Sequence, residues 1–343
     1  MGLGGLAEYG SPRMSADVCW GIRHNSERNR GFTMADTQGL RLRRGPAAAV
    51  LMYHRIERRA VDPLALFVTP DNFAAQIAAL RQFADIVPAG DILLAGDRPR
   101  IAITFDDGYE DNATYAAPVL ESHDAPACIF ATNQFVPDAP EFWWDQLDHL
   151  LLREPSDVAF VEAHLPNRCV RFDVRTVAGR TRTFSYLNRV FRTLARVERE
   201  SCLAHLHGQL GRSPVRCSDH ARLNADELRR LDASGLIEIG GHTATHQSLR
   251  AADDIEAVAE IESNRSALAS VTGRVPRVFA YPYGDGGPRD WVNTRSAGYD
   301  LGFSTVTRAV GRVHRPHWLP RLFIGNWAAE EFTGRVTAAL RAS

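Results

Sequence analysis

The sequence predicts an α/β fold in which parallel strands and helices alternate and close into a barrel. From residue 47 onward, short apolar runs alternate with segments that carry apolar residues at helical spacing. Three of these runs lead into motifs that contain Asp106, His242 and Tyr283. In a parallel barrel the carboxyl ends of the strands meet at one face, where such residues gather. One barrel of this kind would use most of the 343 residues.

The first half of the barrel is expected to contain three strands and two helices. A strand at 47–54 ends in a histidine, and a helix follows from Thr69 because Pro70 suits a first helical turn. One face of that helix is expected to carry Phe73, Ile77 and Leu80. Further along, the pattern predicts a strand at 100–105, a helix at 113–122 and a strand at 127–131.

The alternation then stops between about residues 141 and 222. This stretch opens with Phe142-Trp143-Trp144 and continues with arginine-rich sequence of helical character. We interpret it as a mostly helical insertion within a barrel domain that spans 46–343.

The second half of the barrel resumes at Asn224, which can cap a helix with Glu227 as its capping box, and Gly235 is placed to end that helix. A strand from Leu236 then leads to His242. A helix is expected from Asp253 or Asp254, with Gly273 beyond its end and one face formed by Ile255, Val258, Ile261 and Leu268. The remaining elements are expected to be a strand at 278–281, a short helix that contains Trp291 and is stopped by Gly298, and strands at 301–305 and 319–324.

The composition is that of a globular protein and excludes some chemistry. Hydrophobic residues make up 45% of the chain and charged residues 24%, with a formal net charge of -1, so no electrostatic case exists for nucleic acid as a partner. All 40 basic residues are arginines. Schiff-base and lysine-nucleophile mechanisms are therefore excluded.

The five cysteines indicate reduced thiols. They are widely spaced without a C-x-x-C pair, which argues against a disulfide framework or a thiolate metal site. No apolar stretch approaches the roughly 18 residues of a membrane span, and no signal peptide is evident. We expect a cytoplasmic protein, with peripheral membrane association left open. Residues 1–45 lack periodicity and are expected to be a disordered leader or the product of a mis-assigned start codon.

Two motifs together indicate a divalent-metal site. Asp106 and Asp107 end a strand in a glycine-terminated turn, and His242 and His246 follow another strand in a His-x-x-x-His spacing. Each motif alone is weak, because aspartates favour turns and histidines at strand ends are often structural. Their conjunction supplies ligands for a metal together with a spare carboxylate base.

These motifs, with Phe279-Ala280-Tyr281-Pro282-Tyr283-Gly284, resemble the NodB-type polysaccharide deacetylases, carbohydrate esterase family four. The resemblance covers most of 48–325 and implies an irregular (β/α)7-type barrel. It implies that Asp106 is the general base, that Asp107, His242 and His246 bind the metal, best taken as zinc, and that the main-chain N–H of Tyr283 stabilises the oxyanion. The reaction implied is hydrolytic N-deacetylation of an N-acetylated carbohydrate or glycolipid precursor, which releases acetate.

The chain departs from the family pattern at two places. Ala280 stands where an arginine usually holds the catalytic aspartate, and no histidine follows Leu319-Pro320 in the slot of the general acid. Arg321 is a candidate replacement for the arginine, because its planar guanidinium can clamp a carboxylate, although an ordinary ion pair is the alternative. His54, His314 and His317 are candidates for the acid, with His54 preferred.

Two questions of function stay open at this point. Trp143 and Trp144 either form a sugar-stacking wall or anchor the insertion to the barrel. Besides an N-deacetylase of sugars, the chain could be a C–N amide hydrolase of a small non-sugar metabolite, or a carbohydrate-binding pseudoenzyme, which the missing arginine and histidine suggest. Retention of Asp106 favours catalysis, because binding alone would not require a free carboxylate beside the ligand set.

Overall fold

The structure is a computed structural model of the chain. It describes residues 41–42, 46–136, 139–153, 157–212 and 220–343. Apart from Arg41–Leu42, which form strand β1, the segment expected to be a leader lies outside the described residues.

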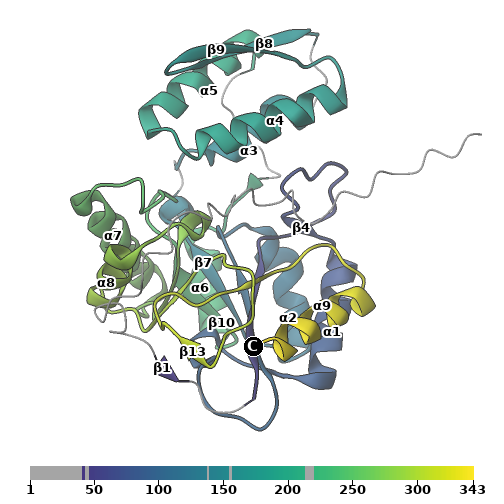
Figure 1. The fold of residues 1–343 in the computed structure, drawn as a ribbon, viewed down its shortest axis with the longest axis vertical. Coiled ribbons are helices and arrows are strands. Elements are labelled where there is room, and N and C mark those ends of the chain that lie inside the picture. Colours follow the sequence, from purple (N-terminus) through teal and green to yellow (C-terminus); the bar gives the residue numbers. More distant parts are fainter. Residues whose placement is uncertain (1–40, 43–45, 137–138, 154–156, 213–219) are drawn as a thin grey trace, which may run out of the picture. The chain divides into compact units, whose positions relative to one another are not determined.

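The central sheet is parallel and confirms the predicted (β/α)7-type barrel (Figure 1). Within the described residues its seven-strand path runs β12-β11-β10-β7-β6-β2-β14. A parallel bridge between Phe303 and Leu319 brings the stretch before β14 back to β12, so the two ends of the path meet. The strands are β2 (Ala48–Tyr53), β6 (Arg100–Phe105), β7 (Ala127–Ala131), β10 (Ile237–Gly241), β11 (Val278–Ala280), β12 (Leu301–Phe303) and β14 (Leu322–Phe323), with β5 (Asp85–Ile86) beside β6.

Helices cover the outside of the sheet. They are α1 (Pro70–Phe83), α2 (Ala117–Ser122), α6 (Ala225–Ala233), α7 (Asp254–Thr272), α8 (Pro288–Ser296) and α9 (Ala329–Arg341). Helix α1 contacts both α2 and α9, and the three lie side by side in Figure 1. Most of these helices and strands contribute apolar side chains to one large buried cluster, and those of β11 and β12 belong to two smaller ones. Burial of this apolar surface is the main favourable contribution to the free energy of folding.

Local signals explain where several helices begin and end. Thr69 caps α1 by accepting a hydrogen bond from the main chain of Asn72, and Asn224 and Glu227 form the predicted capping box of α6. Helix α7 begins after Asp253 and ends at Gly273, which adopts a left-handed conformation with φ of 74°. A glycine reaches that conformation without the strain that a Cβ would cause.

Three predicted elements differ in detail. On α7, Ile261 and Leu268 are buried as predicted, but Ile255 is 84% exposed and Ala257 lies on the buried face in its place. The helix predicted at 113–122 opens with a π-helical turn, Asn112–Ala116. The predicted strand 319–324 is shortened to β14, since Pro320 has no N–H to donate to a ladder.

The segment expected to be an insertion has its own core and is mostly helical. It contains α3 (Trp143–Asp148), a π-helical turn (His149–Arg153), α4 (Val177–Phe191) and α5 (Arg196–Leu210). It also contains an unpredicted antiparallel hairpin, β8 (Phe160–Leu165) and β9 (Arg168–Asp173), which packs against α4 and α5 (Figure 1). Aromatic and aliphatic side chains of these elements form a second buried cluster around Leu147 and Phe191.

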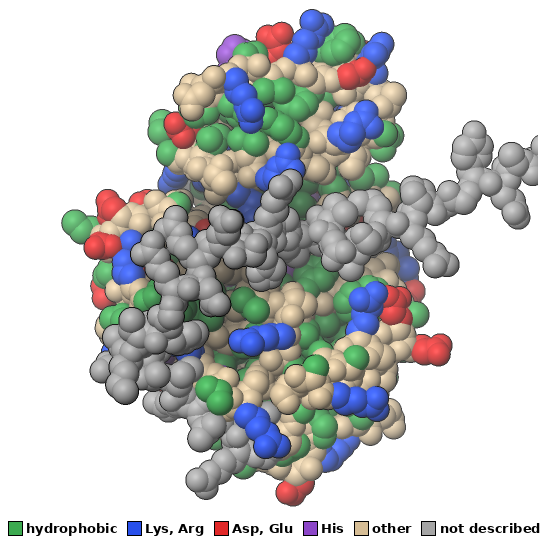
Figure 2. All heavy atoms as spheres, in the orientation of Figure 1, with side chains coloured by type: hydrophobic (Ala, Val, Ile, Leu, Met, Phe, Trp, Pro, Cys, Tyr) green, Lys and Arg blue, Asp and Glu red, His purple; other side chains and the backbone are tan. Residues whose placement is uncertain are grey.

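Several short elements complete the fold. They are β1 with β13 (Val313–His314), β3 (Arg55–Ile56) with β4 (Phe67–Val68), and the 3-10 turns Ala89–Asp91, Asn133–Phe135 and Pro282–Gly284. Among the described residues, no helix combines the length and the apolar character that crossing a bilayer requires. Arginine side chains are spread over the face in Figure 2, with acidic side chains among them.

Candidate active site

The barrel gathers the predicted site residues at the carboxyl ends of its strands. Asp106 and Asp107 follow β6 directly, and His242 follows β10. The rest of the set is His54 after β2, His246 in the loop after β10, Tyr283 in the turn after β11, and Arg321 immediately before β14.

Asp107, His242 and His246 form a buried cluster of potential metal ligands. Asp107 Oδ1 lies 3.4 Å from His242 Nε2 and 3.1 Å from His246 Nε2. One ligand atom from each residue lies within 4.8 Å of the others, and all three side chains are buried. Asp107 Oδ1 nevertheless forms no hydrogen bond in the described part of the structure. A buried carboxylate oxygen without a donor is what a bound cation would satisfy. These three residues could therefore hold a divalent metal ion.

The main chain around His242 fixes the orientation of its ring. His242 Nδ1 lies 2.7 Å from the carbonyl oxygen of Ala280, so Nδ1 carries the proton and donates it to that oxygen. The side chain of Asn264, buried on α7, accepts a hydrogen bond from the His242 N–H at 2.9 Å. The lone pair of Nε2 then faces Asp107, as ligand histidines held by a carbonyl partner do.

The backbone is strained at the site. Of the six non-glycine residues with positive φ in the described structure, four belong to the motifs: Asp107 (76°), Thr243 (61°), His246 (60°) and Tyr283 (58°). Such conformations cost of order 1–3 kcal/mol each and cluster at functional sites, where the surrounding fold enforces them.

Asp106 is held by Arg321 through two hydrogen bonds. Arg321 Nη1 donates to Asp106 Oδ1 at 2.6 Å and Nη2 donates to Oδ2 at 2.7 Å. Arg321 is fully buried, and its remaining donors reach Thr104 Oγ1 and the carbonyl of Ser304. The clamp proposed from the sequence is thus present, supplied by the residue immediately before β14 rather than from the position of Ala280.

This ion pair sets the protonation of Asp106. Burial alone would raise the pKa of Asp106, but the charges of Arg321 and His242 together with the hydrogen bonds from Arg321 outweigh burial and hold that pKa below its ordinary value. Asp106 is therefore a carboxylate at neutral pH, as a general base must be.

Of the three histidines considered for the general acid, His54 lies beside the carboxylate. His54 Nε2 is 3.9 Å from Asp106 Oδ2, and burial lowers the pKa of His54. His314 belongs to β13, where it pairs with Arg41, and the carbonyl of His317 accepts a hydrogen bond from Tyr281. Neither observation places the His314 or His317 imidazole at Asp106.

Aromatic rings from the insertion and from the turn after β11 surround His246. The rings of Trp144 and Tyr283 lie 4.7 and 4.6 Å from its ring, each in an edge-on arrangement. Trp144 Nε1 donates to Tyr109 at 2.8 Å, and Trp143 Nε1 donates to the Tyr283 hydroxyl at 3.1 Å. Both tryptophans are buried, which favours an anchoring role over a sugar-stacking wall.

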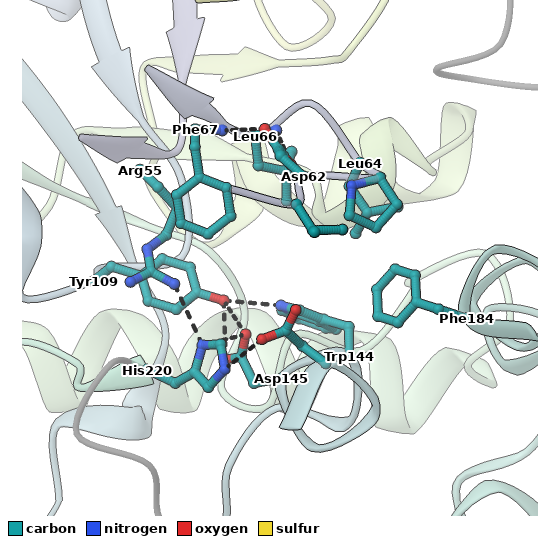
Figure 3. A pocket seen from close by; sticks show the side chains of 13 residues that line it. Arg55, Asp62, Leu64, Leu66, Phe67, Tyr109, Trp144, Asp145, Phe184 and His220 are labelled. Atoms are coloured by element: carbon teal, nitrogen blue, oxygen red, sulfur yellow. Dashed lines mark hydrogen bonds and ion pairs between the residues drawn. The ribbon is translucent and has the colours of Figure 1, made fainter. Parts of the chain in front are cut away.

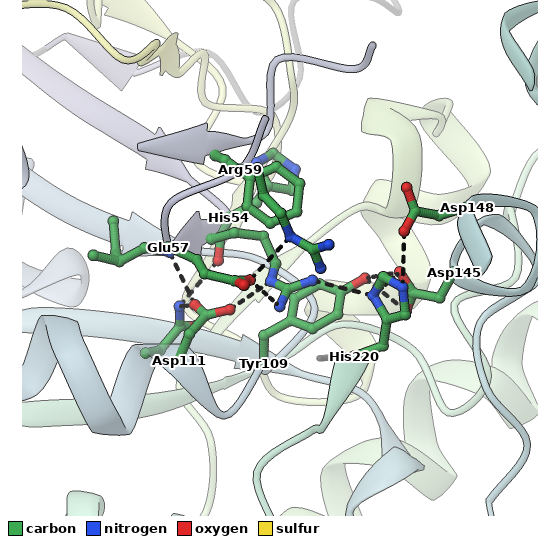
Figure 4. A network of polar contacts seen from close by, with 12 residues as sticks. His54, Glu57, Arg59, Tyr109, Asp111, Asp145, Asp148 and His220 are labelled. Atoms are coloured by element: carbon green, nitrogen blue, oxygen red, sulfur yellow. Dashed lines mark hydrogen bonds and ion pairs between the residues drawn. The ribbon is translucent and has the colours of Figure 1, made fainter. Parts of the chain in front are cut away.

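A buried polar network beside this cluster was not predicted from the sequence (Figure 4). Arg55 donates to Asp111 at 2.5 Å and lies over the ring of Tyr109, whose hydroxyl donates to Asp145 at about 3 Å. His220 bridges Asp145 and Asp148 in turn. These residues come from separate parts of the chain, so no local sequence pattern indicated that they would meet. The network ties the insertion to the loop after β6 that carries Asp106 and Asp107.

A small pocket lies against this network (Figure 3). Its volume is about 30 Å³, roughly that of one water molecule. Tyr109, Asp145 and Trp144 form one wall, and Leu64 and Phe184 form another. Burial raises the pKa of Asp145 to about 6, against the opposing charges of His220 and Arg55.

Replacing Tyr109 with phenylalanine is expected to destabilise the fold. The change leaves Trp144 Nε1–H buried without its acceptor and removes the donor to Asp145. Such a loss costs about 1–3 kcal/mol. Denaturant unfolding measures it, with Tyr115→Phe as the control, because Tyr115 is 45% exposed. Equal stability of the two variants would show that the network contributes nothing to anchoring the insertion.

Comparison with known proteins identifies the family. A family model described as polysaccharide deacetylase matches residues 95–154 and 204–302. The chain belongs to the polysaccharide deacetylase family. The break between the two matched segments covers 155–203, which includes the β8–β9 hairpin and α4. A comparison with curated proteins found no match.

Several solved structures share the fold. PplD of Streptococcus pyogenes, solved with acetate, is 15% identical with a TM-score of 0.55 over 87% of this chain and 99% of its own. BA0330 of Bacillus anthracis is 17% identical with a TM-score of 0.54 over 86% of this chain and 69% of its own. IcaB from Ammonifex degensii is 20% identical with a TM-score of 0.51 over 87% and 98%. Together, family and fold support deacetylation of sugars in general.

Proposed function

We propose that the chain is a metal-dependent N-deacetylase of an N-acetylated sugar in a polysaccharide, oligosaccharide or glycolipid precursor. The observation that carries this proposal is the pair of adjacent carboxylates with different partners. Asp107 faces two imidazoles, whereas Asp106 is clamped by a guanidinium. One carboxylate is thus suited to a metal and the other to a proton.

We propose zinc as the metal, held by Asp107, His242 and His246. Two neutral imidazoles and one carboxylate are a ligand set of catalytic zinc sites. Burial lowers the pKa of His246, so its imidazole is neutral and able to bind a metal. When bound, the ion would polarise the acetamide carbonyl and lower the pKa of water.

The side chains around the metal ligands supply the proton transfers. Asp106 takes a proton from the water as its oxygen adds to the acetamide carbon. The main-chain N–H of Tyr283 donates to the carbonyl oxygen as negative charge develops there. The leaving amine then needs a proton, and we assign its delivery to His54. The products are acetate and a free amino sugar.

The clamp on Asp106 also bears on the alternatives. The pseudoenzyme hypothesis was motivated by a missing arginine and a missing histidine, and Arg321 and His54 now stand at the carboxylate in their place. A binding protein has no need to hold a buried carboxylate ionised.

The test is acetate release from N-acetylated oligosaccharides by the purified, zinc-supplied chain, with small non-sugar acetamides in parallel. Release from the sugars and not from the small amides is the expected result. Hydrolysis confined to the small amides would move the assignment to a metabolite amidase. No release from either would contradict catalysis.

Replacing His54 with alanine is expected to lower kcat and to change the alkaline limb of the pH–rate profile, because proton delivery to the amine would be lost. General acid catalysis contributes roughly 10²–10⁴-fold. His314→Ala and His317→Ala are the matched controls and should retain the profile. An unchanged rate and profile in the His54 variant would remove His54 from the mechanism.

A further inference from the structure

The β8–β9 hairpin carries a cluster of metal-binding side chains on its outer face. Glu162 and His164 are two residues apart on β8, so both point to the same face of the strand. Cys169 on β9 is the cross-strand partner of His164. One ligand atom from each of the three lies within 4.8 Å of the others, and all three side chains are exposed.

The opposite face of the hairpin separates this cluster from the candidate active site. Val161, Ala163 and Leu165 alternate with the cluster residues along β8, and they are buried in the core of the insertion. The outer-face residues therefore point away from that core.

Helix α5 brings a second imidazole to the cluster. The ring of His205 lies 4.0 Å from the ring of His164, measured between centroids. The position of α5 along β8 is fixed by Gln209, whose side chain accepts from the Glu162 N–H at 2.8 Å and donates to the Glu162 carbonyl at 2.7 Å. The imidazole of His205 thus lies next to that of His164, at the side of the cluster of Glu162, His164 and Cys169.

No described cation competes for the carboxylate. Arg171 lies opposite Glu162 in the hairpin, but its guanidinium packs over the ring of Phe160 at 4.1 Å. Glu162 forms no salt bridge within the described residues, and its Oε2 lies 4.0 Å from Cys169 Sγ. The thiol is free and exposed. In the described part of the chain this carboxylate, this thiol and the two imidazoles have no other strong polar partner, so they are able to turn toward a cation.

We propose that Glu162, His164, Cys169 and His205 form a second metal site, which takes zinc or a similar divalent ion of intermediate softness. One thiolate, two imidazoles and one carboxylate make the closed four-ligand set of a structural zinc site rather than the open set of a catalytic one. Zinc bonds of about 2.0–2.3 Å place ligand atoms in a tetrahedron roughly 3.3–3.8 Å apart, so the ligand atoms of Glu162, His164 and Cys169 need to close by about 1 Å. The exposed side chain of His205 needs to turn toward them.

The bound ion would crosslink β8, β9 and α5. Binding requires the thiolate, so Cys169 would release its proton as the metal binds. This site is independent of the proposed deacetylation, because the two ligand sets share no residue.

Cobalt(II) distinguishes the two sites, because thiolate ligation adds an intense near-ultraviolet charge-transfer band that aspartate and histidine ligands do not produce. We expect the metal-stripped full chain to bind two equivalents of cobalt, one of them with this band. Cys169→Ser should abolish the band and leave one equivalent, with unchanged deacetylation at saturating zinc. His164→Ala and His205→Ala should each weaken binding of the second equivalent by more than about tenfold.

Asp173→Asn is the matched control, since Asp173 lies on the same hairpin but pairs with Arg175. This variant should still bind two equivalents of cobalt and show the thiolate charge-transfer band. Binding of a single equivalent without the band would overturn the proposal, as would a band that survives in the Cys169 variant. A chain that fails to deacetylate any sugar but shows the Cys169-dependent band would retain this site and lose only the proposed function.

Discussion

Replacing Asp106 with asparagine is expected to lower acetate release by roughly 10²–10⁴-fold, the contribution typical of a general base. The amide keeps the shape of the side chain but cannot take a proton from water. Zinc binding should persist, because Asp107, His242 and His246 are unchanged. The measurement is kcat at saturating substrate together with zinc content by elemental analysis.

Asp300→Asn is the control for this variant, because Asp300 is an exposed aspartate that pairs with Arg277 away from the cluster. Its kcat should equal that of the parent chain. An Asp106 variant that retains full kcat would rule out Asp106 as the base, and one that loses its zinc would place Asp106 among the ligands.

Replacing Arg321 with glutamine is expected to move the acidic limb of the pH–rate profile to higher pH. Burial raises the pKa of Asp106, and Arg321 provides the main opposing effect. Without the guanidinium the raising effect remains, so the carboxylate is protonated, and activity is lost, at a higher pH than in the parent chain. Removal of one partner of a buried ion pair also costs about 3–5 kcal/mol of stability.

Two further variants separate chemistry from folding in this test. Arg321→Lys keeps the positive charge but not the two parallel hydrogen bonds, so it should fold and show a smaller shift of the acidic limb. Arg335→Gln removes an exposed arginine of α9 and should leave the profile unchanged. An acidic limb that stays in place in folded Arg321 variants would contradict the clamp.

The sequence predicted the strands and the meeting of Asp107, His242 and His246 because both depend on local patterns. The apolar runs before Asp106 and His242 are nearly identical to β6 and β10. Since parallel strands in a barrel end at one face, motifs far apart in the chain could be expected to meet there. Glycine, proline and cap residues marked the helix ends for the same local reasons.

Contacts between side chains far apart in the chain could be proposed from the sequence but could not be established from it. The link between Asp106 and Arg321 spans 215 positions and depends on how the barrel closes beside β14. The network of Arg55, Tyr109 and His220 likewise joins the barrel to the insertion. No spacing in the sequence encodes such contacts, because they arise from tertiary packing.

The hairpin of the insertion did carry a local signal. Val161, Ala163 and Leu165 alternate with polar residues, a period typical of a half-buried strand, and Pro166-Asn167 forms the turn. The arginine-rich surroundings favoured a helical interpretation instead. The spacing of the cysteines argued against a thiolate metal site, but that argument considers only ligands close in sequence, whereas cross-strand register places Cys169 beside His164.

The proposed function requires that Asp107, His242 and His246 hold a metal on which deacetylation depends. The most direct measurement is acetate release from an N-acetylated oligosaccharide by the chain after chelation and after titration with zinc, with Asp107→Asn treated in the same way. We expect the chelated chain to be inactive, activity to return as zinc is restored, and the Asp107 variant to stay inactive at the same zinc concentration. Full release by the metal-free chain, or full recovery of the Asp107 variant, would contradict the account.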